Sequence, residues 1–406
     1  SGSPFIPDRQ WDKPPAMSVA PSIAIPSPRR RGACPTLEAP MQTGDGLLAR
    51  LRLADGQLSP TQLGAIAKLA ALHGNGQVEI SARGNLQVRG LTPASTAPFA
   101  AAVRAIATIE QGLVVETPPL AGDDPTELSD PRGLAAAIRA LAAPLDGRLG
   151  PKVTVVVDGM GQITRAGLKA DIGLTAIAPG RWTLTIAGQP QAEFDAADAP
   201  AAALAVLHQL AERGLAARAT DLIERTALRA QASSATIGRF KVTMGSATGI
   251  ALPFGASDSA ALIALAARAS QMGVTELRLA PHHALLAINA PAEFVREATA
   301  LGFITDLADP RTRISACIGS AGCASGHIPA RAIAEKLAAF LPAGRDLHVS
   351  GCAKGCSHPG RAALTLVGQP DGYGLVINGT AGDTPESVLR ADQLESALGP
   401  SGQGRR

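Results

Sequence analysis

The residues in this sequence that are most suggestive of chemistry are four cysteines within a short stretch. Cys317 and Cys323 lie in ISACIGSAGCASGHIP, and Cys352 and Cys356 lie in LHVSGCAKGCSHPG. The whole chain of 406 residues has only five cysteines. Because thiolates are ligands for soft metals and for metal clusters, this grouping indicates a metal centre.

The spacing of the four cysteines favours a cluster over a single ion. The pattern is Cys-x5-Cys, then 28 residues, then Cys-x3-Cys, whereas zinc sites usually use closer pairs. Four thiolates on glycine-rich loops suit a 4Fe-4S cluster, because glycine lets the backbone approach closely. Buried inert thiols or a structural zinc remain alternatives. The fifth cysteine, Cys34 in RRRGACPTL, is isolated, and we expect it to be structural or near a substrate.

Composition limits the other classes of function. The chain is 46% hydrophobic and 17% charged, which is typical of a globular protein, and its net charge of +3 is too small to indicate a nucleic-acid partner. It has no apolar run long enough for a membrane span. The N-terminal residues lack a signal-peptide pattern, so we expect a cytoplasmic location. The low cysteine content argues against a disulfide framework.

The cysteines occur in only one copy of an internal repeat. Segments 48–91 and 250–290 both predict a strand, a helix and a strand pair, and the alignment places Arg83 opposite His282. Segments 141–161 and 337–357 align without a gap, which places Val156 against Cys352. A scaffold role for the thiols would apply to both copies. Their presence in the second copy alone favours a bound metal centre.

These motifs resemble the sulfite and nitrite reductase superfamily. Its members have Cys-x5-Cys and Cys-x3-Cys arms that hold a 4Fe-4S cluster. EISARGNLQVRG is similar to the family's Thr-Arg-x-x-x-Gln strand pair, with Arg83 and Gln87 at the motif positions, and LGPKVTVVVDG resembles a segment whose lysine is Lys152. The resemblance implies an α+β fold of two pseudo-symmetric halves. Each half is a ferredoxin-like α/β unit plus a second α/β unit, and only the second half carries the cluster.

The resemblance and the repeat together divide the chain into six segments. They are an extended N-terminal arm (1–33), a first ferredoxin-like half-domain (34–118), a first α/β domain without cysteines (119–236), a second ferredoxin-like half-domain (237–307), an iron–sulfur cluster domain (308–395) and a flexible tail (396–406).

Within the superfamily, two segments are most similar to the precorrin-3B synthase family of the oxygen-dependent cobalamin pathway. These are GACPTLEAPMQTGDGLLARLRL and KADIGLTAIAPGRWTLTIAG. The resemblance implies a monooxygenase that hydroxylates precorrin-3A at a meso carbon and forms the ring-A lactone. It implies a 4Fe-4S cluster, a mononuclear non-haem iron, and dioxygen with NADH-derived electrons as co-substrates.

A tetrapyrrole of this kind carries many carboxylates, so its site needs inward-facing cations. The candidates are Arg31, Arg50, Arg52, Arg83, Arg89, Lys152 and Lys354. Family motifs contain Arg83, Gln87 and Lys152, and Arg83 is the predicted catalytic residue. His282 and His283 lie on the turn equivalent to Arg83, so they are candidates for the cavity or for the mononuclear iron.

The sequence does not fix the electron donor, and it allows more than one reaction class. No nicotinamide-binding glycine motif is present, so we expect an external reductase or ferredoxin. One alternative is a sirohaem-dependent nitrite or sulfite reductase, in which Cys356 would bridge the cluster and the sirohaem iron. Another is a non-catalytic protein with a structural iron–sulfur cluster.

Overall fold

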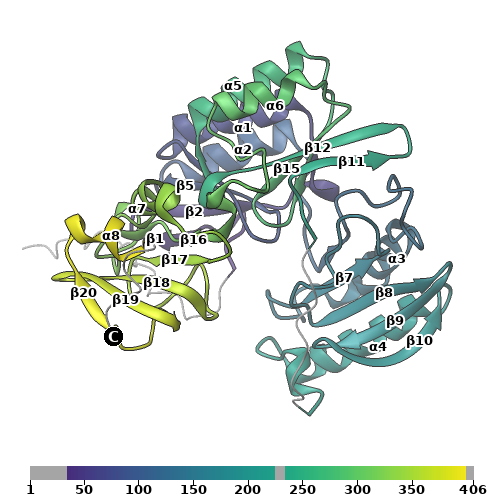
Figure 1. Ribbon diagram of the computed structural model, residues 1–406. Helices are drawn as coiled ribbons and strands as arrows, with labels where there is room; N and C mark the ends of the chain where they lie inside the picture. The colour runs from purple at the N-terminus through teal and green to yellow at the C-terminus, as the bar shows by residue number, and fades with distance from the viewer. Residues whose placement is uncertain (1–33, 225–233, 399–406) are drawn as a thin grey trace, which may run out of the picture. The chain divides into compact units, whose positions relative to one another are not determined.

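A computed structural model describes residues 34–224 and 234–398 of the chain (Figure 1). The predicted N-terminal arm, with Arg31, lies outside the described residues, as do the last eight residues of the predicted tail. The described part has the predicted α+β composition, with four five-stranded sheets. No helix in these two ranges is long and apolar enough to cross a membrane.

The first two sheets contain the repeated hairpins. Sheet A has the order β1-β2-β5-β4-β13, and sheet C has the order β11-β12-β15-β14-β3. The strands of sheet A are β1 (Met41–Thr43), β2 (Gly46–Leu51), β4 (Gln77–Ile80), β5 (Leu86–Leu91) and β13 (Ala256–Asp258). Those of sheet C are β3 (Gln57–Leu58), β11 (Gly238–Val242), β12 (Gly245–Ala251), β14 (Leu277–Ala280) and β15 (Ala284–Ile288).

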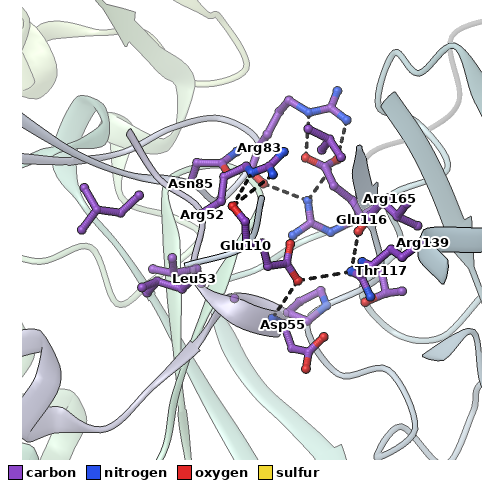
Figure 2. A pocket seen from close by; sticks show the side chains of 17 residues that line it. Arg52, Leu53, Asp55, Arg83, Asn85, Glu110, Glu116, Thr117, Arg139 and Arg165 are labelled. Atoms are coloured by element: carbon purple, nitrogen blue, oxygen red, sulfur yellow. Dashed lines mark hydrogen bonds and ion pairs between the residues drawn. The ribbon is translucent and has the colours of Figure 1, made fainter. Parts of the chain in front are cut away.

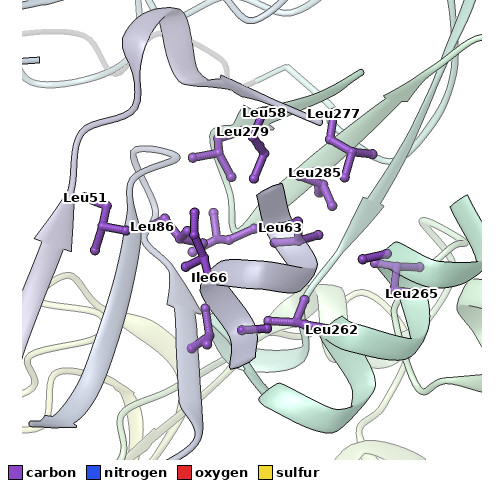
Figure 3. Close-up of a cluster of buried hydrophobic side chains, with 14 of the residues drawn as sticks. Leu51, Leu58, Leu63, Ile66, Leu86, Leu262, Leu265, Leu277, Leu279 and Leu285 are labelled. Carbon is purple, nitrogen blue, oxygen red and sulfur yellow. The ribbon is translucent and has the colours of Figure 1, made fainter. Parts of the chain in front are cut away.

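The two copies exchange a strand. β3 from the first copy pairs with β14 of the second, and β13 from the second pairs with β4 of the first. The helices of these units are α1 (Pro60–His73), α2 (Thr96–Ile106), α5 (Ser259–Gln271) and α6 (Glu293–Ala300). α1 and α5 pack closely, since a Cβ on Gly64 would lie 3.3 Å from that of Ala266. One leucine-rich core therefore contains residues of both copies (Figure 3).

The other two sheets each combine parallel and antiparallel strands. Sheet D runs β10-β9-β8-β7-β6 and sheet E runs β16-β17-β18-β19-β20. Sheet D contains β6 (Val114–Glu116), β7 (Thr154–Asp158), β8 (Ile172–Ala178), β9 (Arg181–Ile186) and β10 (Gln189–Asp195), with α3 (Arg132–Ala142) and α4 (Ala199–Arg213). Sheet E contains β16 (Ile314–Ala316), β17 (Leu347–Ser350), β18 (Ala362–Gln369), β19 (Gly372–Gly379) and β20 (Ser387–Leu389), with α7 (Ala330–Leu337) and α8 (Leu394–Leu398). β6 pairs with β7, although it precedes the expected domain boundary at residue 118.

The strand pairing corrects the alignment of the two copies around the cysteines. Asp158 is the last residue of β7 to pair with β8, and Ser350 is the last of β17 to pair with β18. Two positions further on, Met160 therefore corresponds to Cys352. The gapless sequence alignment, which placed Val156 there, was wrong by four residues.

In the first α/β domain, which lacks cysteines, carboxylates link the loops that correspond to the cysteine loops. The Asp158 carboxylate accepts hydrogen bonds from the Thr164 hydroxyl at 2.6 Å and the Ala166 N–H at 2.8 Å. Asp124 accepts from the Gln162 N–H at 2.6 Å. Backbone N–H groups of the loop after β7 are thus satisfied by side-chain oxygens.

Glu127 in the same loops gives a testable pH dependence. Burial, together with the nearby aspartates, raises the pKa of Glu127 from 4.5 to about 7, and its Oε2 accepts from the Gly122 N–H. A carboxyl group whose pKa is raised on folding stabilises the folded state fully at pH values below its unfolded pKa. That stabilisation is lost as the pH rises through about 7. We therefore expect Glu127→Gln to increase the melting temperature at pH 8 relative to wild type, with a smaller difference at pH 5.

The matched control for this measurement is Glu212→Gln, because Glu212 is an exposed residue of α4. Its melting temperature is expected to follow the wild type at both pH values. Parallel pH curves for wild type and Glu127→Gln would show that Glu127 titrates normally.

Candidate functional site

A cavity of about 950 Å³ lies within the part of the chain that the structure describes. Its walls come from β2, β4 and β5 of sheet A, the end of β12, the β14–β15 turn, β16 and the loop after β17. Pockets for small ligands are roughly 300–1,000 Å³, so this cavity lies at the upper end of that range. A ligand the size of a macrocycle can therefore enter it.

Strand register brings three polar side chains together on the sheet A wall. Arg50 on β2 and Glu79 on β4 both pair with Gln87 on β5, the central strand of the three. With the amide oriented to satisfy both neighbours, Gln87 accepts from Arg50 Nε at 2.9 Å and donates to Glu79 Oε2 at 3.2 Å. The predicted cavity residues Arg50 and Gln87 thus lie side by side.

Four arginines line the cavity: Arg50, Arg89, Arg311 and Arg331. Glu79 is the acidic residue of the same lining, and its Oε1 lies 2.6 Å from Arg331 Nη2. The lining itself therefore carries more positive than negative charge, although Arg89 also pairs with Asp45, outside the lining, at 2.8 Å. Burial lowers the pKa of Arg50, which shows that its guanidinium is poorly hydrated. An anionic ligand would offset that cost.

Sequence patterns did not identify Arg311, Arg331 or Glu79. Arg331 is the second residue of α7, and it reaches the site because α7 packs against β16 and β17. Arg311 lies just before β16 and pairs with Asp309 at 2.7 Å. Glu79 could have been found from its strand, because it is the one charged residue of β4 (QVEI).

The four cysteines occupy loops at the ends of two adjacent strands. Cys317 follows β16 and Cys352 follows β17, and these strands are parallel neighbours. The Gly351 N–H donates to Cys317 Sγ at 3.1 Å. Burial, with the charges of Cys352, Cys317 and Cys323, raises the pKa of Cys356. The four thiols are thus close enough to influence one another.

The loops that carry these thiols fit tightly against each other. A Cβ at Gly351 would lie 2.7 Å from the Gly319 Cα, so only glycine is accommodated there. Across residues 34–224 and 234–398, no three His, Cys, Asp or Glu side chains converge closely enough to hold a single ion. A cluster instead spreads its thiolates over several irons. The donor type and the glycine-tight loops fit such a group.

The two candidate histidines also face the cavity. His282 and His283 form the β14–β15 turn with φ values of 59° and 65°, and both line the cavity. His283 Nδ1 lies 2.6 Å from the Ile80 carbonyl oxygen. Burial lowers the pKa of both imidazoles, and for His282 the charges of His283 and Arg165 add to the effect. Burial thus favours the neutral form of both imidazoles, which is the form in which histidine binds metals. Iron binding by either residue stays a prediction.

The other predicted site residues lie outside this cavity lining. Arg83 forms an ion pair with Glu116 (Figure 2). Its Nη1 also donates to the Lys169 carbonyl at 2.7 Å. Lys152 is exposed, and Lys354 donates to the Ser325 hydroxyl at 2.8 Å beside the cysteine loops. Their contact with a tetrapyrrole stays a prediction.

Comparison with known proteins gives three results. Residues 39–106 match the family described as "Nitrite/Sulfite reductase ferredoxin-like half domain". The chain is 38% identical to a precorrin-3B synthase of Sinorhizobium sp. over 92% of this chain and 88% of that protein. Its fold is similar to the structure of the NirA protein of Mycobacterium tuberculosis, with a TM-score of 0.66 and 19% identity, covering 89% of this chain and 82% of that one.

These results confirm the predicted fold class, a two-half α+β arrangement of the sulfite and nitrite reductase type. The similarity to the Sinorhizobium protein extends over almost the whole chain and is well above the level at which only a fold is conserved. The chain belongs to the precorrin-3B synthase family, within the superfamily of nitrite and sulfite reductases.

Proposed function

We propose that this chain is an oxygen-dependent monooxygenase of cobalamin biosynthesis. It would hydroxylate precorrin-3A at a meso carbon and form the ring-A lactone. The observation that carries the proposal is the arginine-lined cavity of about 950 Å³, which reaches Cys317 and Cys356. The reaction is inferred from the similarity to the Sinorhizobium precorrin-3B synthase and from the family resemblance.

The cavity suits a flat molecule with several carboxylates. Its arginines come from separate elements, so they can bind carboxylates at different points on the rim of one macrocycle. Arginine binds carboxylates in a bidentate manner, which fixes orientation as well as affinity. The apolar residues between these arginines, such as Leu48, Ile237 and Leu252, would contact the faces of the macrocycle.

The cofactors are part of the proposal. Cys317, Cys323, Cys352 and Cys356 would hold a 4Fe-4S cluster, which supplies single electrons when bound. The Gly351 N–H donates to Cys317 Sγ, and hydrogen bonds of this kind tune a cluster's potential. His282 and His283 would be the candidate ligands of a mononuclear iron. Electrons would come from NADH through a separate reductase, and the reaction would take place in the cytoplasm.

Extraction of the cofactors separates this proposal from the sirohaem reductase alternative. The protein is purified anaerobically and extracted with acid acetone, and iron and sulfide are counted. We expect no sirohaem, about four sulfides and more than four irons per chain. A stoichiometric amount of sirohaem would assign the chain to nitrite or sulfite reduction instead.

Arg83→Ala tests the predicted role of Arg83. The family motif predicts that this change increases the KM for precorrin-3A and leaves the iron and sulfide content unchanged. For Arg83 to contact the substrate, its guanidinium has to leave Glu116. Steady-state kinetics with precorrin-3A measure the effect, and unchanged constants would remove Arg83 from the site.

A further inference from the structure

The first half contains a small pocket at the position that corresponds to the large cavity. The cavity is bordered by a tight turn with Phe254 at φ 52° and Gly255 at φ 76°. The small pocket is bordered by the equivalent turn, with Asp55 at φ 51° and Gly56 at φ 68°. Its volume is about 60 Å³. The two copies of the repeat therefore form one large cavity and one much smaller counterpart.

Charged side chains dominate this counterpart pocket (Figure 2). Four arginines from four separate segments line it: Arg52 after β2, Arg83 in the β4–β5 turn, Arg139 on α3, and Arg165 in the loop after β7. Its carboxylates are Asp55, Glu110 and Glu116. With all groups ionised, the lining carries one more positive than negative charge.

The carboxylates do not neutralise all of the arginines. Glu116 forms its ion pair with Arg83 and lies 3.7 Å from Arg165. Glu110 lies 3.4 Å from Arg139. Burial lowers the pKa of Arg165; the charges of Glu116 and Asp158 oppose this shift, and the charge of Arg83 adds to it. Like charges are thus held close together around this small space.

Two donors in the pocket lack an acceptor. Within the part of the chain that the structure describes, Nε of Arg139 and Nε of Arg165 are both buried without a hydrogen-bond partner. Arg165 is only 7% exposed, so bulk water does not satisfy it. A buried, charged donor without an acceptor is destabilising. The pocket has room for several atoms, since one water needs roughly 10–15 Å³ of such space.

We propose that this pocket binds a small oxyanion whose oxygens accept hydrogen bonds from Nε of Arg139 and Nε of Arg165. A carboxylate, a bicarbonate or a phosphate has this chemistry, since each presents oxygens to a guanidinium. The anion compensates the excess positive charge and joins α3 to the loop after β7. Neither Arg139 nor Arg165 lines the proposed tetrapyrrole cavity, but the pocket shares Arg83 with the predicted tetrapyrrole site. Anion binding is measured directly, so its outcome does not depend on the proposed reaction.

Isothermal titration calorimetry on the full-length, cofactor-loaded protein in chloride buffer tests the site. Acetate, bicarbonate and phosphate are titrated separately, which distinguishes planar from tetrahedral oxyanions. We expect saturable binding of at least one of them at one site per chain. Absence of binding by all three anions would overturn the proposal.

Variants of two arginines on α3 locate the binding. Arg139→Lys keeps the positive charge but removes the Nε donor. We expect it to weaken anion binding by at least about tenfold, which is the loss of affinity expected for one charge-assisted hydrogen bond. The control is Arg132→Lys, because Arg132 is exposed and bonds to Asp130; its affinity should equal that of wild type. Equal affinity in wild type, Arg139→Lys and Arg132→Lys would show non-specific binding and would overturn the assignment.

Discussion

Cys352→Ser is expected to abolish the iron–sulfur absorbance of the anaerobically purified protein and its activity on precorrin-3A. Cys352 lies two residues after the end of β17, beside the strand that leads into Cys317. A serine hydroxyl is a much poorer ligand for iron than a thiolate. The loss of one corner ligand leaves the remaining three thiolates on loops whose close packing depends on glycine. The visible spectrum, with iron and sulfide counts, measures the effect.

The matched control is Cys34→Ser, which removes the one cysteine outside the proposed ligand set. It should keep the iron, the sulfide and the spectrum of wild type. Full retention of iron and sulfide by Cys352→Ser would refute its assignment as a ligand. Loss of the cluster in both variants would show instead that the fold does not tolerate serine at these positions.

Arg50→Ala is expected to weaken precorrin-3A binding by roughly 10- to 100-fold, the loss of one charge-assisted hydrogen bond to a carboxylate. Arg50 lines the cavity, and burial already lowers its pKa, so its charge has more to gain from an anion than an exposed arginine does. The dissociation constant is measured anaerobically by absorbance titration of the substrate. The cluster content should not change, because the side chain of Arg50 bonds to Gln87 on the neighbouring strand.

Arg104→Ala is the control for Arg50, because Arg104 is a half-exposed residue of α2 that pairs with Glu38. Its substrate affinity should equal that of wild type. An unchanged dissociation constant for Arg50→Ala would mean that the carboxylates of the substrate lie elsewhere in the cavity or outside it.

The cysteine loops and the repeated halves could be predicted from the sequence because both depend on local patterns. The spacing of glycines and cysteines can be read directly from the sequence. The strand–helix–hairpin order repeats within each half. The register around Cys352 was missed because the segments before β7 and β17 differ in length. Only the hydrogen-bonded pairing of Asp158 and Ser350 with the next strands fixes it.

The long-range contacts of the site could not be predicted. The exchange of β3 and β13 between the two copies joins residues about 200 positions apart, and no local pattern specifies such pairing. Arg331 lies 252 residues from Glu79 in sequence, yet they form an ion pair in the cavity. Arg83 was predicted from a motif, but the position of Glu116 beside it depends on the packing of sheet D against the β4–β5 turn.

Turnover of precorrin-3A under labelled dioxygen tests the central claim most directly. The anaerobically purified protein, with its cluster intact, is mixed with precorrin-3A and a reductant, exposed to ¹⁸O₂, and the product is analysed by mass spectrometry. The proposed monooxygenase predicts a product with one ¹⁸O atom and a lactone on ring A. Recovery of unchanged precorrin-3A, or a product whose added oxygen comes from water, would contradict the proposed function.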